Sequence, residues 1–208
     1  MKYALRPVLA AVALIVTTSA ALAAPVKYSV DKAHTEIGFD VRHFFSKVHG
    51  RFNDFQGTII FDDADPSKIS VDATAVTASI TTQNEKRDAH LKTPDFFDAE
   101  KYPTLSFKST KVTPDGKGKY KVAGDLTMRG VTKPVVFDGE FLGAGAVNVS
   151  GQSWGSKAGF TATTVVNRKD FGISWNKTLD NGGTMLADEV TLTLNIEANQ
   201  VGDETAKK

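Results

Sequence analysis

Hydrophobic and polar residues alternate along most of this chain, a pattern typical of β-strands with one apolar face. The clearest run is 190–196, where Val, Leu, Leu and Ile alternate with Thr, Thr and Asn. Similar runs predict strands at 36–42, 55–61, 69–75, 105–107, 120–128 and 135–141. Turn-forming pairs such as Asp65-Pro66 and Asp115-Gly116 separate them. We therefore predict an all-β fold of about eight antiparallel strands, either a closed barrel or a two-sheet sandwich.

One segment breaks the alternation and predicts a short helix. Residues 82–91 are rich in helix formers, Asn84 can cap the first turn, and Pro94 follows the end. We expect this helix to connect two strands and to lie against the barrel or over one of its ends. The Gly-Ala stretch at 143–146 is interpreted as a flexible loop between strands.

The first residues indicate export from the cytoplasm. Lys2 and Arg6 precede an apolar run, and Ala21-Leu22-Ala23 fits the cleavage site of a secretory signal peptide. We expect a cleaved signal peptide at 1–23, a barrel domain at 24–200 and a flexible tail at 201–208. The apolar run is too short for a transmembrane helix, and the absence of cysteine excludes a lipoprotein anchor. The mature chain is predicted to be periplasmic.

Composition narrows the classes of function. The 208 residues include 25 Lys+Arg and 24 Asp+Glu, so the chain lacks the basic footprint of a nucleic-acid-binding protein. The absence of cysteine excludes disulfides, thiolate metal sites and thiol nucleophiles. The four histidines have no metal-binding spacing, and no serine lies in the Gly-x-Ser-x-Gly context of a hydrolase. We expect no catalytic site, no metal and no other cofactor.

Phenylalanine dominates the aromatic residues, with 13 Phe against 4 Tyr and 2 Trp. Most lie on or beside the apolar strand faces, near small residues such as Gly57, Ala73 and Ala162. Such a wall can fill a barrel completely, or it can leave an apolar cavity for one ligand. Membrane barrels show the same alternation with the apolar face outward, but their two aromatic girdles require more Tyr and Trp.

Two longer motifs stand out. One combines Asn84-x-x-Arg-Asp-x-His-Leu with Asp95-Phe-Phe-Asp and Lys101-Tyr-Pro, and the other runs from Gly124 to Val136. Together they resemble the signature blocks of the YceI-like family of polyisoprenoid-binding, lipocalin-like proteins, and the similarity extends over 28–198. This resemblance implies an eight-stranded barrel with a packed helix and an elongated apolar tunnel for a long isoprenoid or fatty chain. Members of the family are often dimers.

The resemblance and the strand pattern together suggest candidate ligand-binding residues. The expected apolar wall of the tunnel consists of Phe39, Val41, Phe52, Phe55, Phe61, Phe107, Phe137 and Phe160. Arg87 and His90 lie on one helical face and can meet a polar head group at the tunnel mouth. The alternative role is structural, with Arg87 paired to Glu85, Asp88 or Asp95 and His90 hydrogen-bonded to a strand end.

The leading hypothesis is a periplasmic binding protein that transports, stores or sequesters a long isoprenoid or other long-chain amphiphile. Such a protein is expected to contact membranes transiently without spanning them and to bind no nucleic acid. Both a monomer and a homodimer are compatible with the sequence. Two further hypotheses are a stress-related structural or interaction barrel without ligand, and an enzyme that acts on a lipid.

Overall fold

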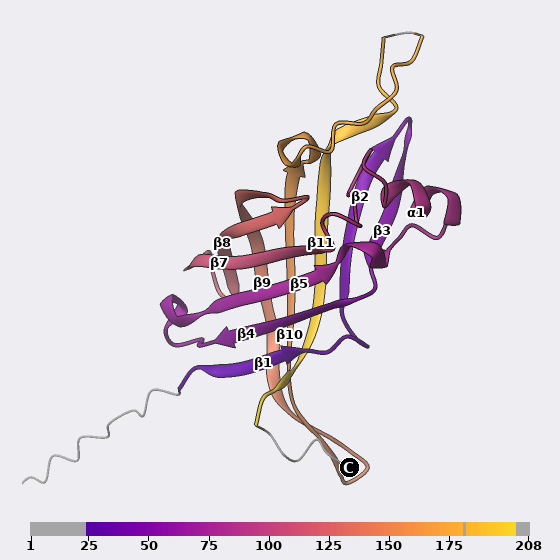
Figure 1. Cartoon of the computed structure of the whole chain (residues 1–208). Helices are drawn as coiled ribbons and strands as arrows, with labels where there is room; N and C mark the ends of the chain where they lie inside the picture. The colour runs from indigo at the N-terminus through magenta and orange to yellow at the C-terminus, as the bar shows by residue number, and fades with distance from the viewer. Residues whose placement is uncertain (1–23, 181, 203–208) are drawn as a thin grey trace, which may run out of the picture.

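In a computed structural model, residues 24–180 and 182–202 form an elongated antiparallel β-barrel (Figure 1). The predicted signal peptide at 1–23 and the tail residues 203–208 lie outside the described residues. The strands of the described part are β1 (Val26–Val30), β2 (Glu36–His43), β3 (Ser46–Phe52), β4 (Phe55–Phe61), β5 (Ser70–Val76), β6 (Ile80–Thr81), β7 (Thr104–Pro114), β8 (Lys119–Met128), β9 (Val131–Val149), β10 (Gln152–Asn167) and β11 (Leu186–Gln200).

Eight of these strands close the barrel in the order β1-β4-β5-β7-β8-β9-β10-β11. Closure depends on the end of β11, where Tyr28 of β1 pairs with Gln200 and Val30 pairs with Ala198. The alternating apolar residues of β11 face the interior, as the period-two pattern requires. The predicted all-β, lipocalin-like barrel is confirmed.

Three further strands widen the barrel on one side. β11 pairs with β2 over residues 186–195 before it pairs with β1, and β3 and β6 continue the sheet beyond β2. The single α-helix among the described residues, α1 (Glu85–Leu91), follows β6. Its start is confirmed as predicted, because the side chain of Asn84 accepts a hydrogen bond of 3.0 Å from the Arg87 amide. Short 3₁₀ turns lie at Pro66–Lys68, Thr77–Ser79 and Arg168–Phe171.

The interpretation of 143–146 as a loop was wrong. These residues belong to β9 and pair with β10, for example Ala144 with Ala158 and Ala146 with Ser156. Small residues carry little strand signal of their own, but a partner strand supplies their backbone hydrogen bonds. Beyond the barrel β9 and β10 continue as a two-stranded arm, which projects below the barrel in Figure 1. Gly143, at a φ of 138°, and the register shift beside Phe160 mark the base of this arm.

The described residues contain no helix with the length and apolar character needed to cross a membrane.

Candidate functional site

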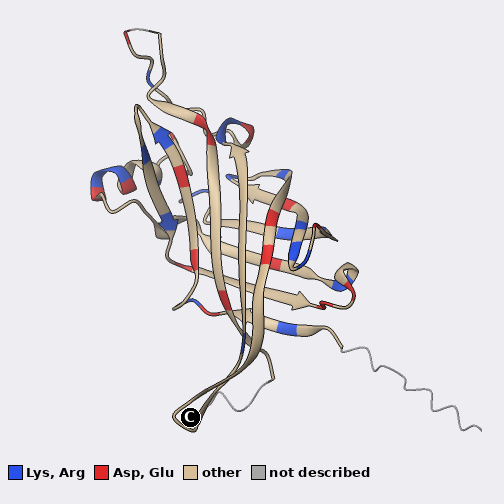
Figure 2. Ribbon diagram, turned by 180° about the vertical axis from the view of Figure 1, so that it is seen from behind, with Lys and Arg blue, Asp and Glu red and all other residues tan. Residues whose placement is uncertain are grey.

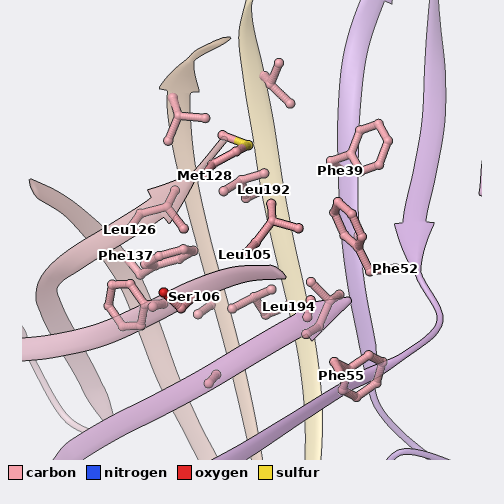
Figure 3. Close-up of a pocket in the computed structure, with 18 of the residues that line it drawn as sticks. Phe39, Phe52, Phe55, Leu105, Ser106, Leu126, Met128, Phe137, Leu192 and Leu194 are labelled. Atoms are coloured by element: carbon pink, nitrogen blue, oxygen red, sulfur yellow. The ribbon is translucent and has the colours of Figure 1, made fainter. Parts of the chain in front are cut away.

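Within the described residues the barrel contains an elongated apolar cavity with a volume of about 610 Å³. Figure 3 shows part of its wall, with Phe39 and Phe52 projecting from β2 and β3 and Leu126, Met128 and Phe137 contributed by β8 and β9. All eight apolar residues named from the sequence line this cavity, and Arg87 and His90 line it as well. Their contact with a ligand stays a prediction.

The cavity is long. Along β11 its lining runs from Leu186 to Ile196, which is roughly 33 Å of strand at about 3.3 Å per residue. Because strands in closed barrels tilt by roughly 40°, the cavity extends about 25 Å along the barrel axis. Its wall is almost entirely hydrocarbon and aromatic, so it discriminates by length and width more than by directional bonds.

Aromatic rings fill the barrel at the end where the arm of β9 and β10 leaves it. The ring centroids of Phe61 and Phe141 are 4.3 Å apart, and Phe160 lies 5.4 Å from Phe61 and 5.5 Å from Phe141. Tyr28 and Tyr120 pack edge-on against this group, and both are buried. We call these five residues the aromatic plug. Phe61 and Phe160 therefore form the floor of the cavity and not its side wall.

Two of the lining phenylalanines place the far end of their rings against glycines on neighbouring strands. The Phe39 ring covers Gly50 so closely that a Cβ atom there would come within 2.2 Å of it. A Cβ at Gly124 would lie 2.5 Å from the Phe107 ring and equally close to the Lys108 carbonyl oxygen. Aromatic rings that cover strand glycines are a known device for fixing both partners. Glycine at these positions therefore leaves the space that the Phe39 and Phe107 rings occupy.

The opposite end of the cavity is bordered by α1, and its polar groups differ from the sequence expectation. Arg87 does not pair with Glu85, Asp88 or Asp95; its Nε donates to Thr82 Oγ1 at 2.7 Å and its Nη2 donates to the Thr82 carbonyl at 2.9 Å. The same Thr82 hydroxyl donates to Asp88 Oδ1, so Thr82 lies between the guanidinium and the nearest carboxylate.

His90 likewise does not bond a strand end. Its Nε2 lies 2.8 Å from Asp95 Oδ2, and its ring packs edge-on against Phe96 and Trp175 at centroid distances of 5.0 and 5.1 Å. Both polar side chains are therefore held by the protein itself. They line the cavity mouth and anchor α1, with Trp175 as an aromatic neighbour.

Asp88 ties α1 to the strand before it. Its carboxylate accepts hydrogen bonds from Thr81 Oγ1 at 2.9 Å, from the Thr82 amide at 2.8 Å and from Thr82 Oγ1 at 2.5 Å. Burial of the carboxyl alone would raise the pKa of Asp88. The hydrogen bonds from Thr82 and Thr81 and the charge of Arg87 outweigh this effect, so the pKa is lowered.

We expect Asp88→Asn to destabilise the protein at pH 7 by about 1–2 kcal/mol and to flatten its acid sensitivity. A lowered folded-state pKa stabilises the fold above the unfolded value of about 4, and this contribution is lost as the pH falls through the folded value. Urea unfolding at pH 7 and pH 3 measures the change. Glu85→Gln, which removes a carboxylate from the same helix without touching Thr82, is the control. An Asp88→Asn variant that loses as much stability on acidification as the wild type would contradict this role.

Several lining residues were not among the sequence candidates. Leu105, Leu126, Met128, Leu192 and Leu194 line the wall, and the period-two runs that contain them carried the signal. Arg168, Trp175 and Met185 line the mouth region but come from segments without alternation. Only the folded arrangement of the connection between β10 and β11 brings them to the cavity.

A cluster of potential metal ligands lies near the plugged end of the barrel. Asp31, His34 and Glu197 place ligand atoms within 4.8 Å of one another. The Lys157 ammonium lies 2.9 Å from Glu197 Oε1 and 3.6 Å from Asp31 Oδ2. The hydrogen bond to Glu197 raises the pKa of Lys157, so this side chain supplies the positive charge of the cluster. The cluster is therefore a salt-bridge network that joins the connection between β1 and β2 to β10 and β11.

Known proteins share both the sequence and the fold. A UPF0312 protein of Photorhabdus laumondii is 42% identical over 165 residues, covering 78% of this chain and 83% of the relative. A UPF0312 protein of Vibrio cholerae is 43% identical over 162 residues, covering 77% and 84%.

Solved structures agree with these relatives. BcnA of Burkholderia cenocepacia superposes with a TM-score of 0.72 at 25% identity, covering 82% of this chain and 99% of that one. The YceI protein of Campylobacter jejuni superposes with a TM-score of 0.64 at 35% identity, covering 82% of this chain and 95% of that one. A domain from Saccharophagus degradans superposes with a TM-score of 0.59 at 12% identity, covering 84% of this chain and 99% of that one. At this identity the likeness is one of fold alone. Residues 28–198 match the family model of the YceI-like domain, and the chain belongs to this family.

Proposed function

We propose that the mature chain is a periplasmic binding protein whose barrel holds one long isoprenoid or other long-chain amphiphile for transport, storage or sequestration. The observation that carries this proposal is the continuous apolar cavity of about 610 Å³, which lies within the range of ligand-binding cavities. Its wall offers a hydrocarbon chain the same kind of environment that a bilayer does.

The length of the cavity favours a long chain. One leaflet accounts for half of a hydrocarbon core of about 30 Å, so an ordinary acyl chain extends about 15 Å. The cavity is about 25 Å long by the strand geometry given above. A single short acyl chain would leave apolar wall uncovered, whereas an isoprenoid longer than one leaflet can occupy the full depth.

A protein with the same fold supports the same class of ligand. The Saccharophagus degradans domain, which has this barrel, is described as a polyisoprenoid binding domain. Periplasmic location rests on the signal-peptide pattern at 1–23. We infer binding rather than catalysis because the cavity wall is almost entirely hydrocarbon and aromatic.

A binding protein of this kind can also release its cargo. The cargo starts in a bilayer that is as apolar as the cavity, and ordering a flexible chain costs part of the gross gain from burial. Transfer between bilayer and cavity is therefore close to balanced, which permits loading and unloading.

Native mass spectrometry of protein purified from its own periplasm tests the proposal. We expect a stoichiometric adduct that denaturing extraction identifies as an isoprenoid quinone, a prenyl phosphate or a similar chain. A protein that has the apo mass, and that takes up no prenyl chain offered in detergent, would overturn the proposal and favour a barrel without ligand. Turnover of the extracted lipid would favour the enzyme instead.

A further inference from the structure

The turn between β2 and β3 exposes a large aromatic side chain to water. Phe44 and Phe45 form this two-residue turn, and Phe45 has a relative exposure of 103%. Such turns favour Gly or Asn because they require positive φ, yet Phe44 adopts a φ of 50°. Neither turn geometry nor water favours a phenylalanine at position 45, so folding alone does not explain Phe45.

The two phenylalanines play different parts. The Phe44 ring packs edge-on against His43 with centroids 4.3 Å apart, and the Phe44 amide donates to the Met185 carbonyl at 3.0 Å. Phe44 therefore fastens the turn to the segment that leads into β11. Phe45 is the exposed residue of a turn that the contacts of Phe44 hold in place.

The charges around the turn are basic. Arg42 Nη1 donates to the Phe44 carbonyl at 2.9 Å, which holds its guanidinium beside the tip, and Lys47 is exposed on the other strand. No acidic residue lies between Val41 and Val48, and the charges of Lys177 and Asp180 in the adjoining segment cancel. Figure 2 shows basic residues near the tip of this hairpin, whereas the neighbouring helix α1 carries both basic and acidic residues.

The turn lies at the end of the cavity that the aromatic plug does not fill. His43 and Val48 at the root of the hairpin line the cavity, as do Met185 and Leu186 next to them. The second exposed apolar hairpin, the arm of β9 and β10, carries Trp154 and projects from the plugged end (Figure 1). That arm has no charged residue from Leu142 to Ser156. Of these two hairpins, the β2–β3 turn is the one that combines an exposed aromatic residue, basic residues and a place at the cavity rim.

We propose that the β2–β3 turn docks the open end of the barrel onto an anionic bilayer. Phe45 inserts at the boundary between head groups and acyl chains, while Arg42 and Lys47 contact lipid phosphates. Aromatic and basic residues together are the side chains that stabilise proteins at this interface. Docking would let a long-chain ligand pass from the bilayer into the cavity without crossing water. This purpose rests on the proposed function.

Vesicle flotation of the mature protein tests this docking. Vesicles of phosphatidylcholine with phosphatidylglycerol are compared with vesicles of phosphatidylcholine alone. Phe45→Ser is expected to lower the partition coefficient about tenfold. Lys47→Gln is expected to lower it about fivefold on anionic vesicles only, with a weaker salt dependence. Trp154→Ser, on the arm at the opposite end, is the matched control and should bind as the wild type does.

A second measurement locates the contact directly. Because the chain has no cysteine, Ser46→Cys and Gln152→Cys each give a single labelling site that leaves Phe45 and Trp154 in place. An environment-sensitive dye at residue 46 should shift to the blue on anionic vesicles, and the dye at residue 152 should not. The reverse pattern, or wild-type protein that does not float, would overturn the proposal. Loss of dimer in Phe45→Ser without loss of vesicle binding would assign the turn to a second copy.

Failure of docking and failure of ligand binding are separable. Uptake of a prenyl chain from detergent needs the cavity but no bilayer, so Phe45→Ser should retain it. Intact uptake without vesicle binding in the wild type would overturn docking alone. Vesicle binding without any uptake would overturn the proposed function alone.

Discussion

Replacing Ala73 with tryptophan is expected to lower the affinity for long prenyl chains at least tenfold while leaving shorter chains bound. Ala73 faces the cavity from β5, where it pairs with Gly57 of β4 and Phe107 of β7. It lies between Val71, which packs toward the aromatic plug, and Ala75, which packs in the cluster near α1. An indole at this depth would separate the floor from the mouth. Each methylene that is displaced from the cavity into water loses about 0.8 kcal/mol of burial free energy, so two displaced methylenes already account for a tenfold loss of affinity.

The measurement is uptake of a series of prenyl chains of increasing length. Val165→Trp is the matched control, because Val165 lies on the outer face of β10 with 57% exposure and the same indole there leaves the cavity empty. The extra volume of tryptophan at position 73 is expected to lower the free energy of unfolding by about 1–3 kcal/mol, which thermal unfolding measures. If Ala73→Trp proves too unstable, Ala73→Leu should give a smaller length-dependent loss. Unchanged uptake of the longest chain by a folded Ala73→Trp variant would show that the ligand does not pass this level.

The barrel could be predicted from the sequence because half-buried strands leave a period-two signal. The run at 190–196 shows it most clearly, and its apolar members line the cavity. The signal is weak where small residues predominate, so 143–146 was misread as a loop although β10 pairs with it. The pairing of β11 with β2 at one end and with β1 at the other could not be predicted either, since strands that are far apart in sequence leave no local pattern of their pairing.

The apolar wall was predictable for the same reason, whereas the polar mouth was not. Alternation tells which face of a strand is apolar, and the closed barrel turns that face inward. The partners of Arg87 and His90 depend instead on how the segment from Thr82 to Asp95 folds back on itself. The sequence offers several nearby side chains that could equally well form hydrogen bonds with Arg87 or His90. Only the fold selects Thr82 for Arg87 and Asp95 for His90.

Arg168→Met is expected to lower the free energy of unfolding by about 3–5 kcal/mol, the largest stability effect of any variant named here. The Arg168 side chain is only 5% exposed. Its Nη1 donates to the carbonyls of Ile173 and Trp175 at 2.7 and 2.8 Å, and its Nε donates to the Ala187 carbonyl at 2.9 Å. Burial lowers the pKa of Arg168, partly offset by the charge of Asp188. Methionine retains the apolar stem but leaves these carbonyls without a donor.

Lys169→Met is the matched control, since Lys169 and Arg168 both pair with Asp188. The Lys169 side chain is 47% exposed and lies 2.8 Å from Asp188 Oδ2, so its loss should cost under about 1 kcal/mol. Urea unfolding of both variants measures the difference. Equal, small losses would show that the guanidinium does not hold the connection between β10 and β11. If Arg168→Met loses much more stability than Lys169→Met, Arg168→Met should also weaken prenyl-chain uptake, because Trp175 and Met185 reach the cavity mouth from that connection.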